Sequence, residues 1–174
     1  MTQQQQNVRT RMTVTKISLK FQEFDLAINT ARLRMAVSIA SKLKFGAKSG
    51  NRTWIKRFFD EVIGVCGEIA VAKLGKFYFV PGLNEFHIVP DVFRDVEVRS
   101  TDRDDGCLII RDNDVLEHRF ILAIVSGSDV VLAGWIYGTE GATSDFLKNP
   151  NNHVAAWFIP ITKLRPMETF QVGA

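Results

Sequence analysis

The spacing of the hydrophobic residues changes near Gly75, and this change limits the folds open to the chain. Before it, hydrophobic residues recur every three or four positions over Phe21–Leu43 and again over Ile55–Ile69, which is the pattern of amphipathic helices. A helix pair followed by a strand-rich half predicts an α+β fold, with the N-terminal helices packed on a mixed, largely antiparallel central sheet. The predicted strands are short runs rich in β-branched and aromatic residues at 77–80, 86–89, 94–100, 107–111, 120–125 and 130–136.

Several element ends can also be placed from the sequence. Thr53 is a suitable N-cap for the second helix, which we expect to run to about Lys73, and Gly75 can end it. Polar or Gly/Asp segments separate the later runs, so we expect several neighbouring strands to form antiparallel hairpins or meanders. A short helix near 142–147 and a last apolar run at 155–161 complete the prediction.

The length and composition indicate one domain. The 174 residues are 46% hydrophobic, enough to bury a core without disulfides or structural metals. We expect a flexible, Gln-rich arm at 1–15 and a single domain at 16–174. Cys66 and Cys107 lie in apolar runs without metal-binding spacing, which is typical of reduced core residues. No uncharged apolar stretch approaches the roughly 20 residues needed to cross a bilayer, so we expect a cytoplasmic protein without a membrane partner.

Charge is distributed unevenly along the chain. Residues 1–60 carry 12 Lys and Arg against 3 Asp and Glu, whereas residues 61–174 carry 10 against 16, so their net charges are +9 and −6. A basic region can attract a polyanion, and clustered carboxylates can hold a cation. Solvated helix ends and loops would explain the basic residues equally well. The candidates for contact with a nucleic-acid backbone are Lys42, Lys44, Lys48 and Arg52.

Glu68 stands out within the second predicted helix. It is the only charged residue between Val62 and Ala72, and glycines at 64 and 67 flank it. Burying a carboxylate without a cation or hydrogen bonds costs several kcal/mol, so Glu68 should be protonated or have a partner. The partner is either a metal ion or a nearby Lys or Arg.

A second set of acidic residues lies at the start of a predicted strand. Strand alternation sends Val96 and Val98 to one face and Glu97 and Arg99 to the other. Asp91 precedes this strand, where a hairpin turn can bring its carboxylate beside Glu97 for a hard, oxygen-seeking ion. Asp95 is a substitute ligand for the same ion. Exposed Glu and Arg side chains on a solvent-facing strand are nevertheless ordinary.

Taken in order, these residues resemble a known signature. A helix Glu, then Pro-Asp, then Glu-x-Arg on a strand resembles the PD-(D/E)XK nuclease superfamily. The segments GEIAVAKLG (67–75), PDVFRDVEVRST (90–101), GCLIIRDND (106–114) and GWIYG (134–138) are similar to small nuclease-like proteins encoded by phages and prophages. The resemblance covers roughly residues 53–165 and implies a restriction-endonuclease-like core.

The resemblance implies Mg²⁺- or Mn²⁺-dependent hydrolysis of phosphodiester bonds in DNA. Glu68, Asp91 and Glu97 would bind one or two ions, with the backbone carbonyl of Val98 as a further ligand. The ion would activate a water for attack on phosphorus and neutralise charge on the phosphate. A phage-encoded protein would act in the host cytoplasm, with DNA as its main partner and a protein partner or a second copy of the chain as further ones.

The chain departs from the family signature at position 99, where the family usually has Lys. Arg99 stays protonated and cannot act as a general base, but it can donate to a phosphate oxygen and stabilise a transition state. The change argues equally for a catalytically inactive nuclease-fold protein that binds DNA or a protein partner, in phage packaging, assembly or counter-defence. The histidines at 87, 118 and 153 lack metal-ligand spacing, and we expect each to be a surface or partly buried residue.

Overall fold

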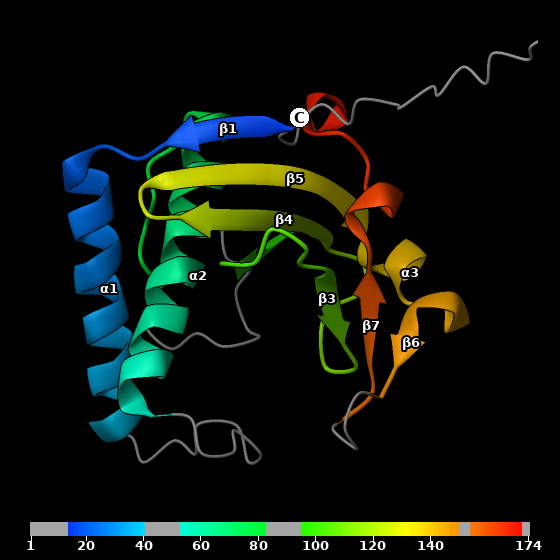
Figure 1. Cartoon of the computed structure of the whole chain (residues 1–174), viewed down its shortest axis with the longest axis horizontal. Helices are drawn as coiled ribbons and strands as arrows, with labels where there is room; N and C mark the ends of the chain where they lie inside the picture. The colour runs from blue at the N-terminus through cyan, green and yellow to red at the C-terminus, as the bar shows by residue number, and fades with distance from the viewer. Residues whose placement is uncertain (1–13, 41–52, 83–94, 150–153, 172–174) are drawn as a thin grey trace, which may run out of the picture.

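The computed structural model describes residues 14–40, 53–82, 95–149 and 154–171. A short strand precedes two long helices, and strands follow (Figure 1). The main elements are β1 (Thr15–Ser18), α1 (Phe21–Ala40), α2 (Trp54–Gly75), β2 (Val96–Thr101), β3 (Leu108–Arg111), β4 (Arg119–Ser126), β5 (Asp129–Tyr137), α3 (Gly138–Gly141), β6 (Leu147–Lys148) and β7 (Ala156–Ile159). Short 3₁₀ helices lie at Ser144–Phe146, Ile161–Lys163 and Met167–Thr169.

The strands form two sheets. A four-stranded sheet has the order β1-β5-β4-β2, in which β2 and β4 are parallel and the other pairs are antiparallel. A smaller antiparallel sheet has the order β3-β7-β6. Helices α1 and α2 lie on one side of the larger sheet, and the smaller sheet lies toward its other side (Figure 1). The fold is therefore α+β, with two N-terminal helices packed on a mixed four-stranded sheet.

The larger sheet has a hydrophobic core on each face because β4 is apolar on both. Ile121 and Ala123 pack with the two helices, whereas Phe120 and Leu122 pack with β3 and β7. All four side chains are almost completely buried, and full burial of a large apolar side chain stabilises a fold by about 1.5–3 kcal/mol. The second core holds the smaller sheet against β4 and so fixes the position of the chain between β3 and β4.

Helix α2 lies close against β2 and β4, and a glycine makes this approach possible. A Cβ atom at Gly67 would lie 2.1 Å from Ser100 Oγ and 3.0 Å from the Ala123 Cβ. The hydroxyl of Ser100 donates a 3.4 Å hydrogen bond to the carbonyl of Gly64 one turn earlier. The sheet face next to α2 is therefore the one that carries Val96 and Val98, both of which are buried in the helix-side core.

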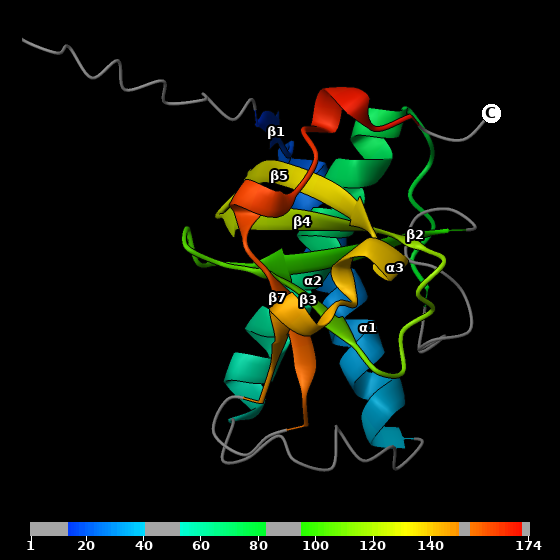
Figure 2. The same ribbon diagram turned by 90° about the vertical axis from the view of Figure 1, so that its right-hand side faces the viewer.

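The C-terminal segment returns to the larger sheet after β7 (Figure 2). Trp135 and Arg165 exchange backbone hydrogen bonds of 3.0 and 2.8 Å, and the indole of Trp135 donates to Thr169 Oγ1 at 3.0 Å. The guanidinium of Arg165 lies 4.7 Å from the centre of the Trp135 ring. These contacts fasten the end of the described chain onto β5.

The structure confirms both long helices and corrects part of the strand prediction. Thr53 is the N-cap of α2, since its side chain accepts a hydrogen bond from the backbone N–H of Lys56 at 3.3 Å, while Lys76 supplies the left-handed residue after the helix. Residues 77–80 form no strand, although their composition favours one. The predicted strand at 86–89 lies outside the described residues. No helix in the described part of the chain is long and apolar enough to cross a membrane.

The pairing of the strands also differs from a simple meander. The prediction of an antiparallel hairpin is confirmed for β4 and β5, where Gly127 takes the left-handed conformation (φ 61°) that the tight turn requires. The expectation is wrong for β2 and β3, which belong to different sheets, and β2 instead pairs in parallel with β4. This arrangement places Arg119 Cα beside Val96 Cα and sets the register of the candidate site.

Candidate functional site

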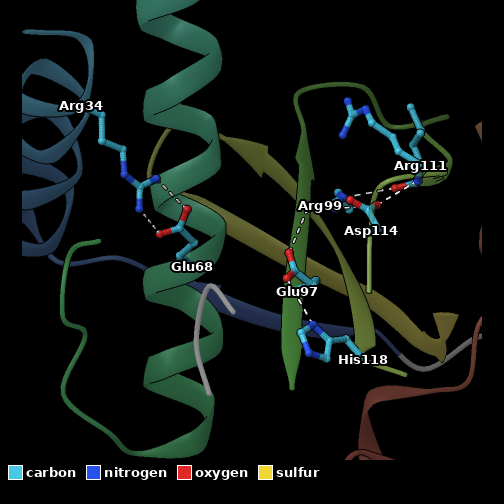
Figure 3. Close-up of polar contacts among 8 residues, drawn as sticks. Arg34, Glu68, Glu97, Arg99, Arg111, Asp114 and His118 are labelled. Atoms are coloured by element: carbon cyan, nitrogen blue, oxygen red, sulfur yellow. Dashed lines mark hydrogen bonds and ion pairs between the residues drawn. The ribbon is translucent and has the colours of Figure 1, made fainter. Parts of the chain in front are cut away.

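The candidate site is built on the face of β2 that points away from the helices. Val96 and Val98 are buried toward α2, and alternation places Glu97 and Arg99 on the opposite face, as the sequence predicts. Arg99 Nη1 donates to Glu97 Oε2 at 3.3 Å (Figure 3). The two side chains remain 16% and 20% exposed, so the pair is partly buried but reachable from solvent.

Arg99 is held by contacts from three directions. Its Nη2 donates to Asp114 Oδ2 at 2.8 Å, its Nε donates to the carbonyl of Ile109 at 3.2 Å, and its guanidinium lies 5.3 Å from the centre of the Phe120 ring. The Asp114 side chain is only 2% exposed. A buried carboxylate needs a charged or hydrogen-bonded partner, and Arg99 provides one. The guanidinium is therefore fixed in orientation before any ligand arrives.

His118 forms the other boundary of the site, in the connection between β3 and β4. Its Nδ1 lies 3.4 Å from Glu97 Oε1, and the hydrogen-bonding role of the ring depends on its tautomer (Figure 3). The backbone of His118 is fixed by hydrogen bonds of its N–H to the carbonyl of Val115 and of its carbonyl to the N–H of Gly138. Glu97 thus lies between an arginine on its own strand and a histidine from the next segment.

Glu68 has a different setting. Both of its carboxylate oxygens accept 2.8 Å hydrogen bonds from the Nη atoms of Arg34 on α1, and Arg34 Nε donates to the carbonyl of Gly82 at 2.8 Å (Figure 3). The two charged side chains are 14% and 7% exposed. A bidentate pair of this kind compensates for the loss of hydration on burial. Of the two partners considered for Glu68 from the sequence, the structure shows a basic residue.

The two carboxylates available from the predicted metal set point in different directions. Glu68 projects from α2 toward α1, whereas Glu97 projects from the far face of β2 toward His118 (Figure 3). Asp91 lies outside the described residues. A shared ion therefore stays a prediction, and it requires Glu68 to exchange Arg34 for the metal. In the described ranges, no three His, Cys, Asp or Glu side chains group closely enough to hold a metal ion.

Of the remaining candidate site residues, Val98 and Asp95 lie in the described part of the chain. The Val98 side chain is buried in the core between the larger sheet and the helices, and the role of its backbone carbonyl as a metal ligand stays a prediction. Asp95, the substitute ligand, pairs instead with the buried Arg119 at 2.7 and 2.8 Å and joins the start of β2 to the start of β4. The basic set Lys42, Lys44, Lys48 and Arg52 lies outside the described residues, so its contact with nucleic acid stays a prediction.

Sequence reasoning missed two residues that complete the environment of Glu97 and Arg99. Asp114 and His118 both come from the β3–β4 connection, and neither has a spacing that links it to β2. The available signal was the dense polar run from Arg111 to His118, which follows a strand directly. Polar residues just beyond a strand often serve binding or catalysis, but the pattern alone cannot show which strand they meet.

Comparison with known proteins adds no relative. No protein-family model, curated protein or solved structure matches this chain.

Proposed function

We propose that the protein hydrolyses phosphodiester bonds of DNA at a metal-dependent site centred on Glu97, in the manner of PD-(D/E)XK nucleases with a restriction-endonuclease-like core. One observation carries the proposal: Glu97 and Arg99 share one face of β2, partly exposed and in contact with each other. The resemblance supplies the metal and the substrate class. The mixed sheet covered by helices on one face is compatible with that core.

The contacts of Glu97 suit a metal ligand better than those of Glu68. Its hydrogen bonds to Arg99 and His118 measure 3.3 and 3.4 Å, near the upper limit for such bonds, so each of these two contacts is weaker than a 2.8 Å bond. The 2.8 Å bonds of Glu68 to Arg34 are harder to replace. With Asp91 as the second acid, Glu97 would hold a Mg²⁺ or Mn²⁺ ion that activates water and neutralises developing charge.

Arg99 would act on the phosphate and not on the proton. A guanidinium remains charged at physiological pH, and its planar donors match two phosphate oxygens. Since Asp114 and the Ile109 carbonyl fix its position, Arg99 needs little reorganisation to stabilise charge in the transition state. The basic residues at 42, 44, 48 and 52 would supply contacts to the DNA backbone.

A cleavage assay tests the hydrolytic proposal. We expect purified protein with Mg²⁺ or Mn²⁺ to cut single-stranded, duplex or branched DNA, and Glu97→Gln to lower the rate at least a hundredfold, the scale of losing an essential group at a metal centre. Glu117→Gln is the matched control, because Glu117 is an exposed acid in the adjacent connection. Intact DNA in all three forms, with wild type and Glu97→Gln behaving alike, would refute the proposal.

A second candidate is a nuclease-fold protein that binds DNA or a protein partner without cutting. One contact and one residue identity favour it: Arg34 holds both oxygens of Glu68, and an arginine occupies the usual lysine position at 99. This candidate predicts DNA binding that weakens with salt and is unchanged by EDTA. A stable protein complex formed without DNA would instead indicate an interaction module in packaging, assembly or counter-defence.

A further inference from the structure

One carboxylate oxygen beside the candidate site accepts hydrogen bonds from the side chain of one arginine and from the backbone of another. Asp114 Oδ2 accepts from Arg99 Nη2 and from the backbone N–H of Arg111, each at 2.8 Å. The turn that follows β3 is closed by the backbone hydrogen bond from Asp114 N–H to the Arg111 carbonyl at 3.1 Å. The side chain of Arg111 therefore starts from a fixed point next to the Arg99 guanidinium (Figure 3).

The cluster contains two arginines and two carboxylates, but both carboxylates form their ion pairs with the same arginine. Arg99 pairs with both nearby acids, Glu97 and Asp114. Arg111 lies close enough to feel both the positive charge of Arg99 and the negative charge of Asp114, yet its guanidinium forms no ion pair with a carboxylate in the described part of the chain. Arg111 is exposed overall, so an anion from solvent can reach it.

Arg111 is also held in an unfavourable environment for a cation. Crowding by protein atoms removes part of its hydration, and the charge of Arg99 repels it, and both effects lower the pKa of Arg111. Neighbouring charges of one sign are common where a protein binds a ligand of the other sign.

We propose that Arg111 and Arg99 form an anion site beside Glu97 that accepts a phosphate group of a nucleic-acid strand. The ligand class rests on the proposed function. The local charges fit it: a phosphodiester carries one negative charge and tolerates Glu97 nearby, whereas a free dianionic phosphate is repelled more strongly. Two guanidiniums can each donate to a non-bridging oxygen, as arginines commonly do at phosphates.

The test measures binding of fluorescently labelled single-stranded and duplex oligonucleotides by anisotropy, in EDTA so that no strand is cut. We expect Arg111→Gln to weaken binding about tenfold at low salt and to reduce the slope of log K against log [salt] by about 0.7–0.9. Arg111→Lys should retain part of the affinity. The control is Arg103→Gln, which removes the same charge from a 71% exposed arginine that pairs with Asp105 in the β2–β3 turn; it should change binding less than twofold.

The outcomes separate this inference from the proposed function. Equal binding by Arg111→Gln and Arg103→Gln, or no binding of either oligonucleotide by wild type, would overturn the anion site even if metal-dependent cleavage is observed. Arg111-dependent binding without cleavage would keep the site and remove the hydrolytic proposal. Inorganic phosphate serves as a competitor, and displacement of the oligonucleotide at equimolar phosphate would overturn the assignment to a diester. Unchanged thermal unfolding of Arg111→Gln would exclude a merely structural effect.

Discussion

The ion pair between Arg34 and Glu68 joins α1 to α2, and its contribution to the free energy of unfolding can be measured. Replacing Arg34 by Met leaves the Glu68 carboxylate, 7% exposed, without its guanidinium. Removing one partner of a buried pair costs about 3–5 kcal/mol. The lost hydrogen bond to the Gly82 carbonyl adds about 1 kcal/mol, while the residual exposure of Arg34 favours the lower end. We therefore expect a loss of about 4 kcal/mol, or roughly 8–16 °C in melting temperature for a chain of this size.

Urea unfolding followed by circular dichroism at neutral pH measures this loss in a double-mutant cycle. The variants are Arg34→Met, Glu68→Met and the pair together. Two apolar side chains of suitable length can replace a buried ion pair at little cost, so the double variant should be more stable than either single one. The coupling free energy should be at least about 2 kcal/mol.

Two results would refute this reasoning. Single variants that each lose less than about 1 kcal/mol would show that the pair is effectively solvated, as surface pairs are. A double variant that loses the sum of the single losses would show that the two residues act independently. Either result would favour the metal role of Glu68, which calorimetry with Mn²⁺ on wild type and Glu68→Gln then tests directly.

Two further predictions concern α2. Gly67→Ala should destabilise the protein by about 1–3 kcal/mol because its Cβ would meet β2 and β4, whereas Gly64→Ala, with no described atom within 4 Å of its Cβ, should be neutral or stabilising by up to about 1 kcal/mol; equal effects of the two in urea unfolding would contradict the close approach. Burial raises the pKa of Glu61 above 4.5, with Arg34 opposing and Asp60 adding to the rise. The folded state therefore disfavours the ionised form, and this penalty appears as pH rises through the folded pKa. Glu61→Gln should be more stable than wild type at pH 7 and equal to it near pH 4; the same difference at both pH values would exclude this explanation.

The parts of the fold that local patterns control could be predicted from the sequence. The helical spacing predicted α1 and α2, Thr53 predicted the N-cap, and alternation in β2 placed Val96 and Glu97 on opposite faces. These features depend on neighbours within a turn or a strand. The same reasoning failed for 77–80, where β-propensity alone does not supply a partner strand.

Features that depend on distant pairing could not be predicted in this way. Strand β1 is four residues long and pairs with β5, more than 100 residues later, as in the hydrogen bond from Ser18 Oγ to Asp129 at a separation of 111 residues. The partner of Glu68 comes from a helix face 34 residues earlier. The sequence indicated that Glu68 needs a cation, but every basic residue nearby met that condition. Only the packing of α1 on α2 selects Arg34.

The arginine at position 99 shows how the two candidate functions share one physical basis. Three of its donors are already directed, to Glu97, Asp114 and the Ile109 carbonyl, in a fork that a lysine ammonium cannot reproduce. Such a residue holds charge in place and does not transfer protons. In a hydrolytic reaction Arg99 would stabilise charge on the phosphate, and in simple binding it would hold the same phosphate. In the proposed reaction a metal ion at Glu97 would be the element that separates cleavage from simple binding, so Glu97→Gln should lower cleavage at least a hundredfold while leaving Arg111-dependent binding in EDTA intact.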